Sequence, residues 1–118
     1  MSTQRLVGKH CQPCEGETAA LPPASVAEHL LQLKGWSLAH EGQKIRKEWV
    51  VKDFKSGIEF FNRVAEVAEN EGHHPDLKLA GYRNVAIEIF THAVGGLTEN
   101  DFILAAKIDQ LPIELKRK

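Results

Sequence analysis

The sequence predicts an α+β domain in which three helices pack on one face of a four-stranded antiparallel sheet. Segments with helical spacing of apolar residues alternate with segments rich in strand formers, in the order helix, hairpin, helix, hairpin, helix. Short turns join the strands of each pair and make them antiparallel, and no strand-helix-strand rhythm requires a parallel sheet. A chain of 118 residues with 42% apolar and 26% charged residues suits one compact domain.

The N-terminal part of the chain is expected to precede the folded domain. Residues 1–24 read as an extended arm because they end in Leu-Pro-Pro-Ala, and prolines disfavour helix. Ser25 followed by Glu28 has the spacing of a capping box, so the first helix is predicted to begin at Ser25 and to end at Gly35. The domain is therefore predicted to span residues 25–118.

The first hairpin and the second helix follow directly. Strand formers at 36–38 and 45–51 flank a turn at 41–43. Asp53 is a favourable N-cap for the second helix and Gly72 a favourable end. The predicted buried face of this helix consists of residues spaced by three and four, namely Phe54, Ile58, Phe61, Ala65 and Ala68.

The second hairpin and the last helix complete the domain. Val85, Ile87 and Ile89 recur with the period of a half-buried strand, and residues 82–84 are the predicted turn. Thr98 followed by Asp101 has the spacing of a capping box and predicts the start of the last helix.

Two adjacent histidines, His73 and His74, stand between Gly72 and Pro75. If the second hairpin turns near Arg83, residues whose numbers sum to about 166 face each other, which places His74 opposite His92. The fold is thus predicted to gather three histidines at one end of the sheet, beside the end of the second helix, with Glu69 close by.

Imidazole exchanges protons near neutral pH, so three histidines with a carboxylate favour an acid/base site. One alternative is structural, because a histidine at a helix C-terminus interacts favourably with the helix dipole. Another is a zinc site with an open position. Adjacent histidines on a strand would splay apart, and Pro75 holds His74 in an extended conformation, so an acid/base site without metal is the simpler interpretation.

Other features of the sequence limit the function classes. A net charge of -1 provides no general field for nucleic acid or an anionic membrane, and no apolar run is long enough to span a bilayer. The N-terminus lacks the apolar core of a secretory signal, so a cytoplasmic protein is expected. Cys11 and Cys14, with His10 before them, could form part of a zinc site, but reduced thiols on the arm are the simpler interpretation.

The stretches EGHHPDL and THAVGGLTENDFILAAKID together resemble the pterin-4a-carbinolamine dehydratase family, from about residue 25 to the end. The resemblance implies a hydro-lyase that converts 4a-hydroxytetrahydropterin to quinonoid dihydropterin and water, and so recycles the tetrahydropterin used by aromatic amino acid hydroxylases. It implies no cofactor, no metal, no nucleic-acid or membrane partner, and a homodimer or homotetramer whose sheets join.

Carried over position by position, the resemblance implies catalytic roles for His73, His74 and His92. Glu69, Pro75 and Asp101 are the implied substrate-binding residues, although Asp101 could equally serve to cap the last helix.

Two other functions remain open from the sequence. Animal members of the family also act as dimerisation cofactors for a homeodomain transcription factor, which would make this chain a protein-interaction module. A role in molybdopterin metabolism would use the same pterin pocket.

Overall fold

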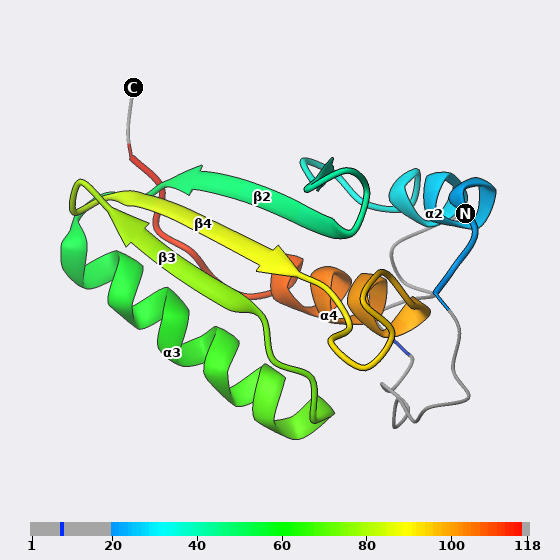
Figure 1. Ribbon diagram of the computed structural model, residues 1–118. Coiled ribbons are helices and arrows are strands. Elements are labelled where there is room, and N and C mark those ends of the chain that lie inside the picture. Colours follow the sequence, from blue (N-terminus) through cyan, green and yellow to red (C-terminus); the bar gives the residue numbers. More distant parts are fainter. Residues whose placement is uncertain (1–7, 9–19, 117–118) are drawn as a thin grey trace.

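The computed structural model describes residue 8 and residues 20–116 of the chain. Within that part, the elements in chain order are α2 (Pro23–Leu30), β1 (Ser37–Ala39), β2 (Lys44–Val50), α3 (Phe54–Glu71), β3 (Asp76–Ala80), β4 (Asn84–Ile89) and α4 (Glu99–Asp109). The predicted fold class is confirmed: the three helices and the four-stranded antiparallel sheet occur in the expected order (Figure 1).

The sheet joins the two hairpins through their second strands. The strand order is β1-β2-β4-β3, and β2 pairs with β4 in a register that places Ile45 opposite Ile89. Figure 1 shows α3 and α4 on the same side of the sheet. The other face carries charged side chains, among them those of Arg46, Lys78 and Glu88. Within the part of the chain that the structure describes, the helices therefore cover one face of the sheet only.

The core lies between the sheet and the helices α3 and α4. Ile45, Val85, Ile87 and Ile89 are buried at alternate positions of β2 and β4, as the predicted strand period requires. Helix α4 is buried almost all round, because every residue from 100 to 106 is buried. Burial of each large apolar side chain contributes about 1.5–3 kcal/mol, so this helix anchors the domain.

Helix α2 begins earlier and ends earlier than predicted. Its N-cap is Pro22 and its first residue is Pro23, so the capping box at Ser25 does not form. Proline is tolerated in the first turn of a helix, where its missing N–H has no intrahelical partner to lose. The helix ends at Leu30, and only after that does the chain reach the left-handed Gly35.

The predicted ends of α3 are confirmed, and of its predicted buried face Ala68 is buried and Phe61 partly buried, whereas the rest of that face is wrong. The Asp53 carboxylate accepts a bond of 2.8 Å from the Ser56 N–H, and Gly72 is left-handed at φ 64°. The buried face consists of Ser56, Gly57, Phe60, Val64 and Ala68.

The helix carries two apolar stripes, and a glycine decides between them. A Cβ at Gly57 would lie 3.2 Å from the Leu79 methyl groups, so the bare backbone lets α3 pack closely under β3. Phe54 and Ile58 of the other stripe stay 54% and 39% exposed.

The second hairpin turns one residue earlier than predicted, over residues 81–83. Gly81 and Tyr82 both have positive φ, and β3 pairs with β4 so that Ala80 faces Asn84. Paired numbers therefore sum to 164, and the predicted pairing of His74 with His92 is wrong. Both histidines lie outside the strands, since β3 begins after Pro75 and β4 ends at Ile89.

Candidate active site

The end of helix α3 sets the direction of the His73 side chain. Because Gly72 is left-handed, the His73 N–H turns back to donate to the Ala68 carbonyl at 3.2 Å. The His73 ring then meets the first turn of α4, where its Nε2 lies 2.6 Å from Oδ1 of Asp101. The His73 side chain is 11% exposed and that of Asp101 is fully buried. Two helices far apart in sequence therefore meet in one short polar contact.

Asp101 joins three parts of the fold. Its Oδ2 accepts from the Thr98 N–H at 2.8 Å, which confirms the predicted role of Asp101 in capping α4. The same oxygen accepts from the Thr91 hydroxyl at 2.9 Å. A fully buried carboxylate needs such donors, and here they leave Oδ1 directed at His73.

His92 lies beside this cluster through its neighbour Thr91. A bridge between Thr91 and Gly96 closes the loop that carries His92, and the Val94 and Gly95 N–H groups donate to the Thr91 carbonyl. The His92 ring is exposed and contacts the Phe90 ring, with centroids 4.0 Å apart. His73 and His92 are thus connected through Asp101 and Thr91.

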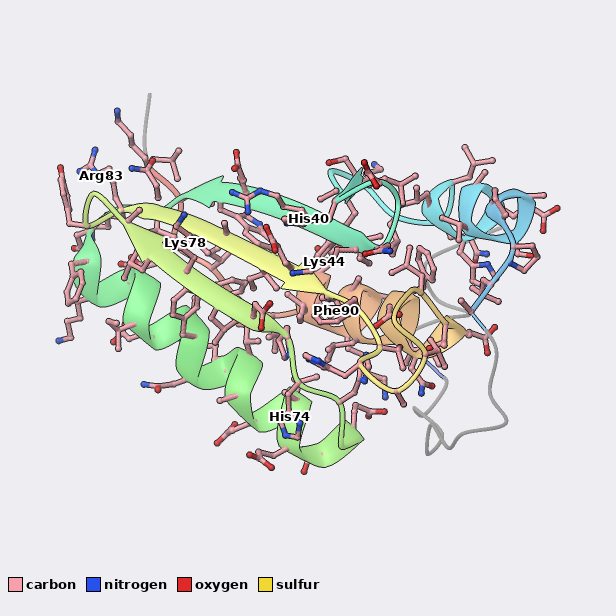
Figure 2. All side chains as sticks on the ribbon, viewed as in Figure 1. His40, Lys44, His74, Lys78, Arg83 and Phe90 are labelled. Carbon is pink, nitrogen blue, oxygen red and sulfur yellow. The ribbon has the colours of Figure 1, made fainter. Side chains whose placement is uncertain are left out.

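His74 points to a different environment from His73. Its Nε2 lies 3.5 Å from Oε2 of Glu69, and the two side chains are 61% and 78% exposed. Figure 2 shows His74 at the end of α3. Pro75 then leads into β3. The structure therefore brings His74 together with Glu69, and His73 together with Asp101, as two separate contacts at the same helix end.

Sequence reasoning missed Thr91 and Phe90. Continuing the β4 alternation from Val85 and Ile89 would have placed Thr91 on the buried side and Phe90 on the outer side. Thr91 is indeed buried at 2% exposure, and its hydroxyl bonds both Asp101 and Thr98.

A metal site is not apparent among residue 8 and residues 20–116, where no three His, Cys, Asp or Glu side chains are grouped as metal ligands would be. Cys11, Cys14 and His10 lie outside the described residues. The absence of metal and cofactor from the reaction therefore stays a prediction.

A hollow of about 530 Å³ lies on the outer face of the sheet, away from the histidines. Its lining includes Lys78, Ala80, Asn84 and Ala86, at the turn end of the second hairpin. The polar chemistry is at the opposite end of these strands, so we place the candidate active site at His73, Asp101 and His92.

Comparison with known proteins assigns this arrangement to a family. A sequence profile described as pterin 4 alpha carbinolamine dehydratase matches residues 19–111, which include the histidine pair, Thr91, His92 and Asp101. The chain belongs to the pterin-4a-carbinolamine dehydratase family. This confirms the resemblance found in the sequence and places the chain among hydro-lyase enzymes.

Individual members of the family align over most of the chain. It is 53% identical to the mitochondrial pterin-4-alpha-carbinolamine dehydratase 2 of Arabidopsis thaliana over 92% of its length, and it spans 60% of that relative. It is 44% identical to a putative pterin-4-alpha-carbinolamine dehydratase of Nitrosospira multiformis, covering 90% of this chain and 91% of that one. A transcriptional coactivator/pterin dehydratase from Brucella melitensis has a similar structure, with a TM-score of 0.71, 30% identity, and coverage of 76% and 95%.

None of the helices in the described part of the chain is long and apolar enough to cross a membrane. The plant relative is named as mitochondrial. The cytoplasmic location expected from the sequence stays a prediction.

Proposed function

We propose that the protein dehydrates 4a-hydroxytetrahydropterin to quinonoid dihydropterin by histidine acid/base catalysis and so recycles a tetrahydropterin cofactor. In this reaction the C4a–O bond breaks and the hydroxyl takes a proton to leave as water. N5 loses a proton as the C4a=N5 bond forms. One acid and one base suffice, and no electrons are exchanged with another molecule.

The observation that carries the proposal is the contact between His73 and Asp101. With Asp101 ionised, the Nε2–H of His73 donates to it, which leaves Nδ1 of the same ring to exchange a proton with substrate. Asp101 is fully buried, so we assign it the positioning of His73 as well as the capping of α4.

The remaining residues take roles around this pair. His92 reaches solvent next to Thr91, and it supplies the second proton transfer. His74, which lies beside Glu69 at the end of α3, belongs to the same catalytic group, and Glu69 and Pro75 contact the substrate. We assign acid and base to the histidines as a group.

The test is the rate at which the purified protein dehydrates freshly generated 4a-hydroxytetrahydropterin, compared with the spontaneous rate. His73→Ala or His92→Ala should lower kcat substantially, within the roughly 10²–10⁴-fold typical of one acid/base group, and the double variant should leave almost no activity. His29→Ala, a histidine of α2 whose ring nitrogens contact Ser25 and Glu99, is the control and should keep its rate.

Circular dichroism confirms that each variant is folded. A wild-type rate no faster than the spontaneous reaction would rule the proposal out and favour the protein-interaction alternative. Full activity in both single variants would rule out the histidine mechanism alone.

We also infer that the protein self-associates as a dimer or tetramer. Within the described residues, β3 has a partner strand on one side only, and Figure 1 shows it alongside α3, on which Phe54 and Ile58 are exposed. Leu77 on that strand is 39% exposed, like Ile58 on the helix. An unpaired edge beside apolar side chains favours burial against a second copy.

A further inference from the structure

His92 and His73 are held in different ways. Carboxylate oxygen fixes the His73 ring, whereas among the contacts of the described residues the His92 ring has neither a hydrogen bond nor an ion pair. Its ring contact is with Phe90, at a centroid distance of 4.0 Å and an interplanar angle of 48°. His92 is exposed, so this contact sets the direction of its ring.

Phe90 is itself held by a charged side chain. The Nζ of Lys44 lies 4.7 Å from the centroid of the Phe90 ring, within the range of a cation–π interaction. Lys44 is the first residue of β2, and Phe90 directly follows β4. In Figure 2 the two side chains lie together at the same end of the sheet.

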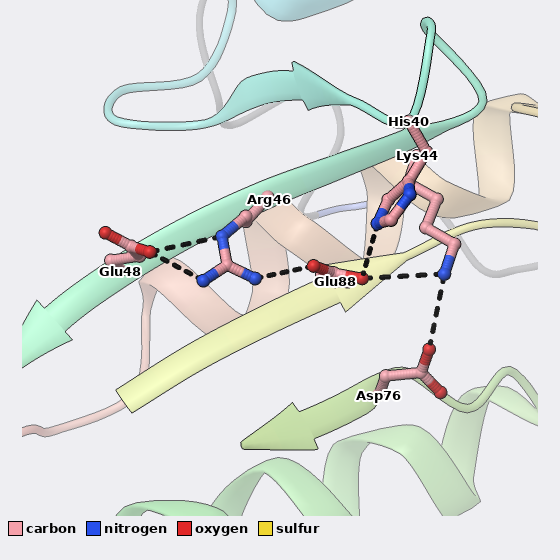
Figure 3. A network of polar contacts seen from close by, with 6 residues as sticks. All are labelled: His40, Lys44, Arg46, Glu48, Asp76 and Glu88. Atoms are coloured by element: carbon pink, nitrogen blue, oxygen red, sulfur yellow. Dashed lines mark hydrogen bonds and ion pairs between the residues drawn. The ribbon is translucent and has the colours of Figure 1, made fainter. Parts of the chain in front are cut away.

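An ionic network on the outer face of the sheet fixes Lys44 in turn (Figure 3). Its Nζ lies 3.5 Å from Oε1 of Glu88 and 3.8 Å from Oδ2 of Asp76, so three strands contribute to the network. Lys44 and Glu88 are 22% and 18% exposed, which limits the screening of their attraction by water.

The charge on Glu88 is maintained by its neighbours. Burial alone would raise the pKa of this carboxyl, but the bond from Arg46 and the charge of Lys44 outweigh burial and lower the pKa. Arg46 bonds Oε2, while Oε1 faces both Lys44 and Nε2 of His40, each at 3.5 Å. Glu88 is therefore ionised at neutral pH and keeps the lysine in place.

We infer that Phe90 and Lys44 are positioning residues for His92: Lys44, held by Glu88 and Asp76, steadies the Phe90 ring, and Phe90 orients the His92 imidazole for proton transfer. The inference rests on the proposed function for its catalytic consequence. It connects a charged network that lies outside the histidine cluster to one of the reacting groups.

Removing the aromatic ring is the first test. Phe90→Leu keeps an apolar side chain but loses the ring, so kcat should fall by about 3- to 10-fold, the equivalent of one aromatic pair, while KM changes less. Phe90→Tyr keeps the ring and should restore the rate. Tyr82→Leu is the matched control, because Arg83 lies over that ring at the same 4.7 Å but at the turn of the second hairpin. It should keep the wild-type rate.

Removing the cation is the second test. Lys44→Met should lower kcat by roughly 2- to 5-fold, as expected for an exposed cation–π contact. Lys44→Arg keeps a cation and should lose less. Lys78→Met removes a lysine from the same face of the sheet that has no contact with Phe90, and it should leave kcat unchanged.

Proton NMR of the His92 imidazole separates positioning from a general loss of stability. The His92 ring resonance is assigned by its disappearance in His92→Ala. It should move in Phe90→Leu as the ring current is lost, move less in Lys44→Met, and stay in place in Tyr82→Leu. A resonance that stays in place in Phe90→Leu would overturn the inference.

Activity and NMR together distinguish the two possible failures. A moved resonance with a kcat equal to that of Tyr82→Leu would overturn the positioning role. A wild-type protein without dehydratase activity would overturn the proposed function, and the His92 resonance in Lys44→Met, which keeps the Phe90 ring, would then decide whether Lys44 and Phe90 set the orientation of His92.

Discussion

At the scale of single residues, Asp101 serves both the fold and the candidate site. One of its carboxylate oxygens accepts from Thr98 and Thr91, and the other faces His73. Asp101 thus has a structural and a chemical role, because the contacts that cap α4 also direct its carboxylate at the His73 imidazole. Family resemblance alone suggested a contact with substrate, whereas full burial favours an action through His73.

Replacing Asp101 by asparagine should affect both stability and catalysis. The amide nitrogen would face one of three donors, so the free energy of unfolding should fall by about 1–3 kcal/mol, measured by urea denaturation. The kcat of the folded protein should fall toward that of His73→Ala. A variant that loses stability but keeps its kcat would show that Asp101 only supports the fold. Asp109→Asn, on the same helix but bonded to Trp36 and Lys47, controls for the loss of a carboxylate.

At the scale of elements, the end of α3 is tied to α4 at two points. Besides the contact of His73 with Asp101, the Lys107 Nζ lies 2.7 Å from Oε2 of Glu71. Glu71 is the last residue of α3 and only 4% exposed, so its charge depends on compensation by partners such as Lys107. This pair fixes the helix end from which His73 projects.

Removing one partner of this ion pair should therefore lower the free energy of unfolding more than replacing both partners by apolar residues. Lys107→Met should lower the free energy of unfolding by about 3 kcal/mol, because the buried Glu71 carboxylate loses the charge of Lys107. The double variant Glu71→Leu with Lys107→Met should recover most of that loss. Lys52→Met, which breaks the exposed pair with Glu114, should cost at most about 1 kcal/mol. If Lys107→Met and Lys52→Met lowered the free energy of unfolding equally, the pair of Glu71 and Lys107 would not behave as a buried ion pair.

The ends of α3 and the start of α4 were predictable because capping chemistry is local, whereas the capping-box spacing at Ser25 did not define the start of α2. Asp53, Gly72 and the Thr98–Asp101 pair each act within a few residues of the helix end they define. The face of α3 was not, since both of its stripes are apolar and the choice depends on how closely Gly57 approaches Leu79 on another element.

The candidate site was likewise predictable from the sequence only in part. The histidines were found from their type and grouping, and motif resemblance added Asp101. The contact of His73 with Asp101 joins residues 28 apart and depends on the packing of α3 against α4. The register error arose because Gly81 and Tyr82 both turn left-handed, which moved the hairpin by one residue and removed the expected pairing of His74 with His92.

At the scale of the whole molecule, the two faces of the sheet differ in what they can do. The covered face supplies the core and, at one end, the buried pair of His73 and Asp101. The open face supplies the network around Glu88, which reaches the same end through Phe90 (Figures 2 and 3). His73 and His92 therefore lie at the same end of the sheet. His73 contacts the core helix α4 through Asp101, and His92 is connected through Phe90 to the charged open face.

Self-association is the prediction that belongs to this scale. Figure 1 shows α3 alongside the edge strand β3, and we expect the exposed Ile58 of this helix to lie in the contact with a second copy, where a charge would be costly. Light scattering at micromolar concentration should give the mass of a closed dimer or tetramer for the wild type, and a smaller mass for Ile58→Asp. Leu31→Asp, 85% exposed at the end of α2, should keep the wild-type mass. A monomeric wild type would rule out self-association, and an Ile58→Asp variant of unchanged mass would move the contact elsewhere on the surface.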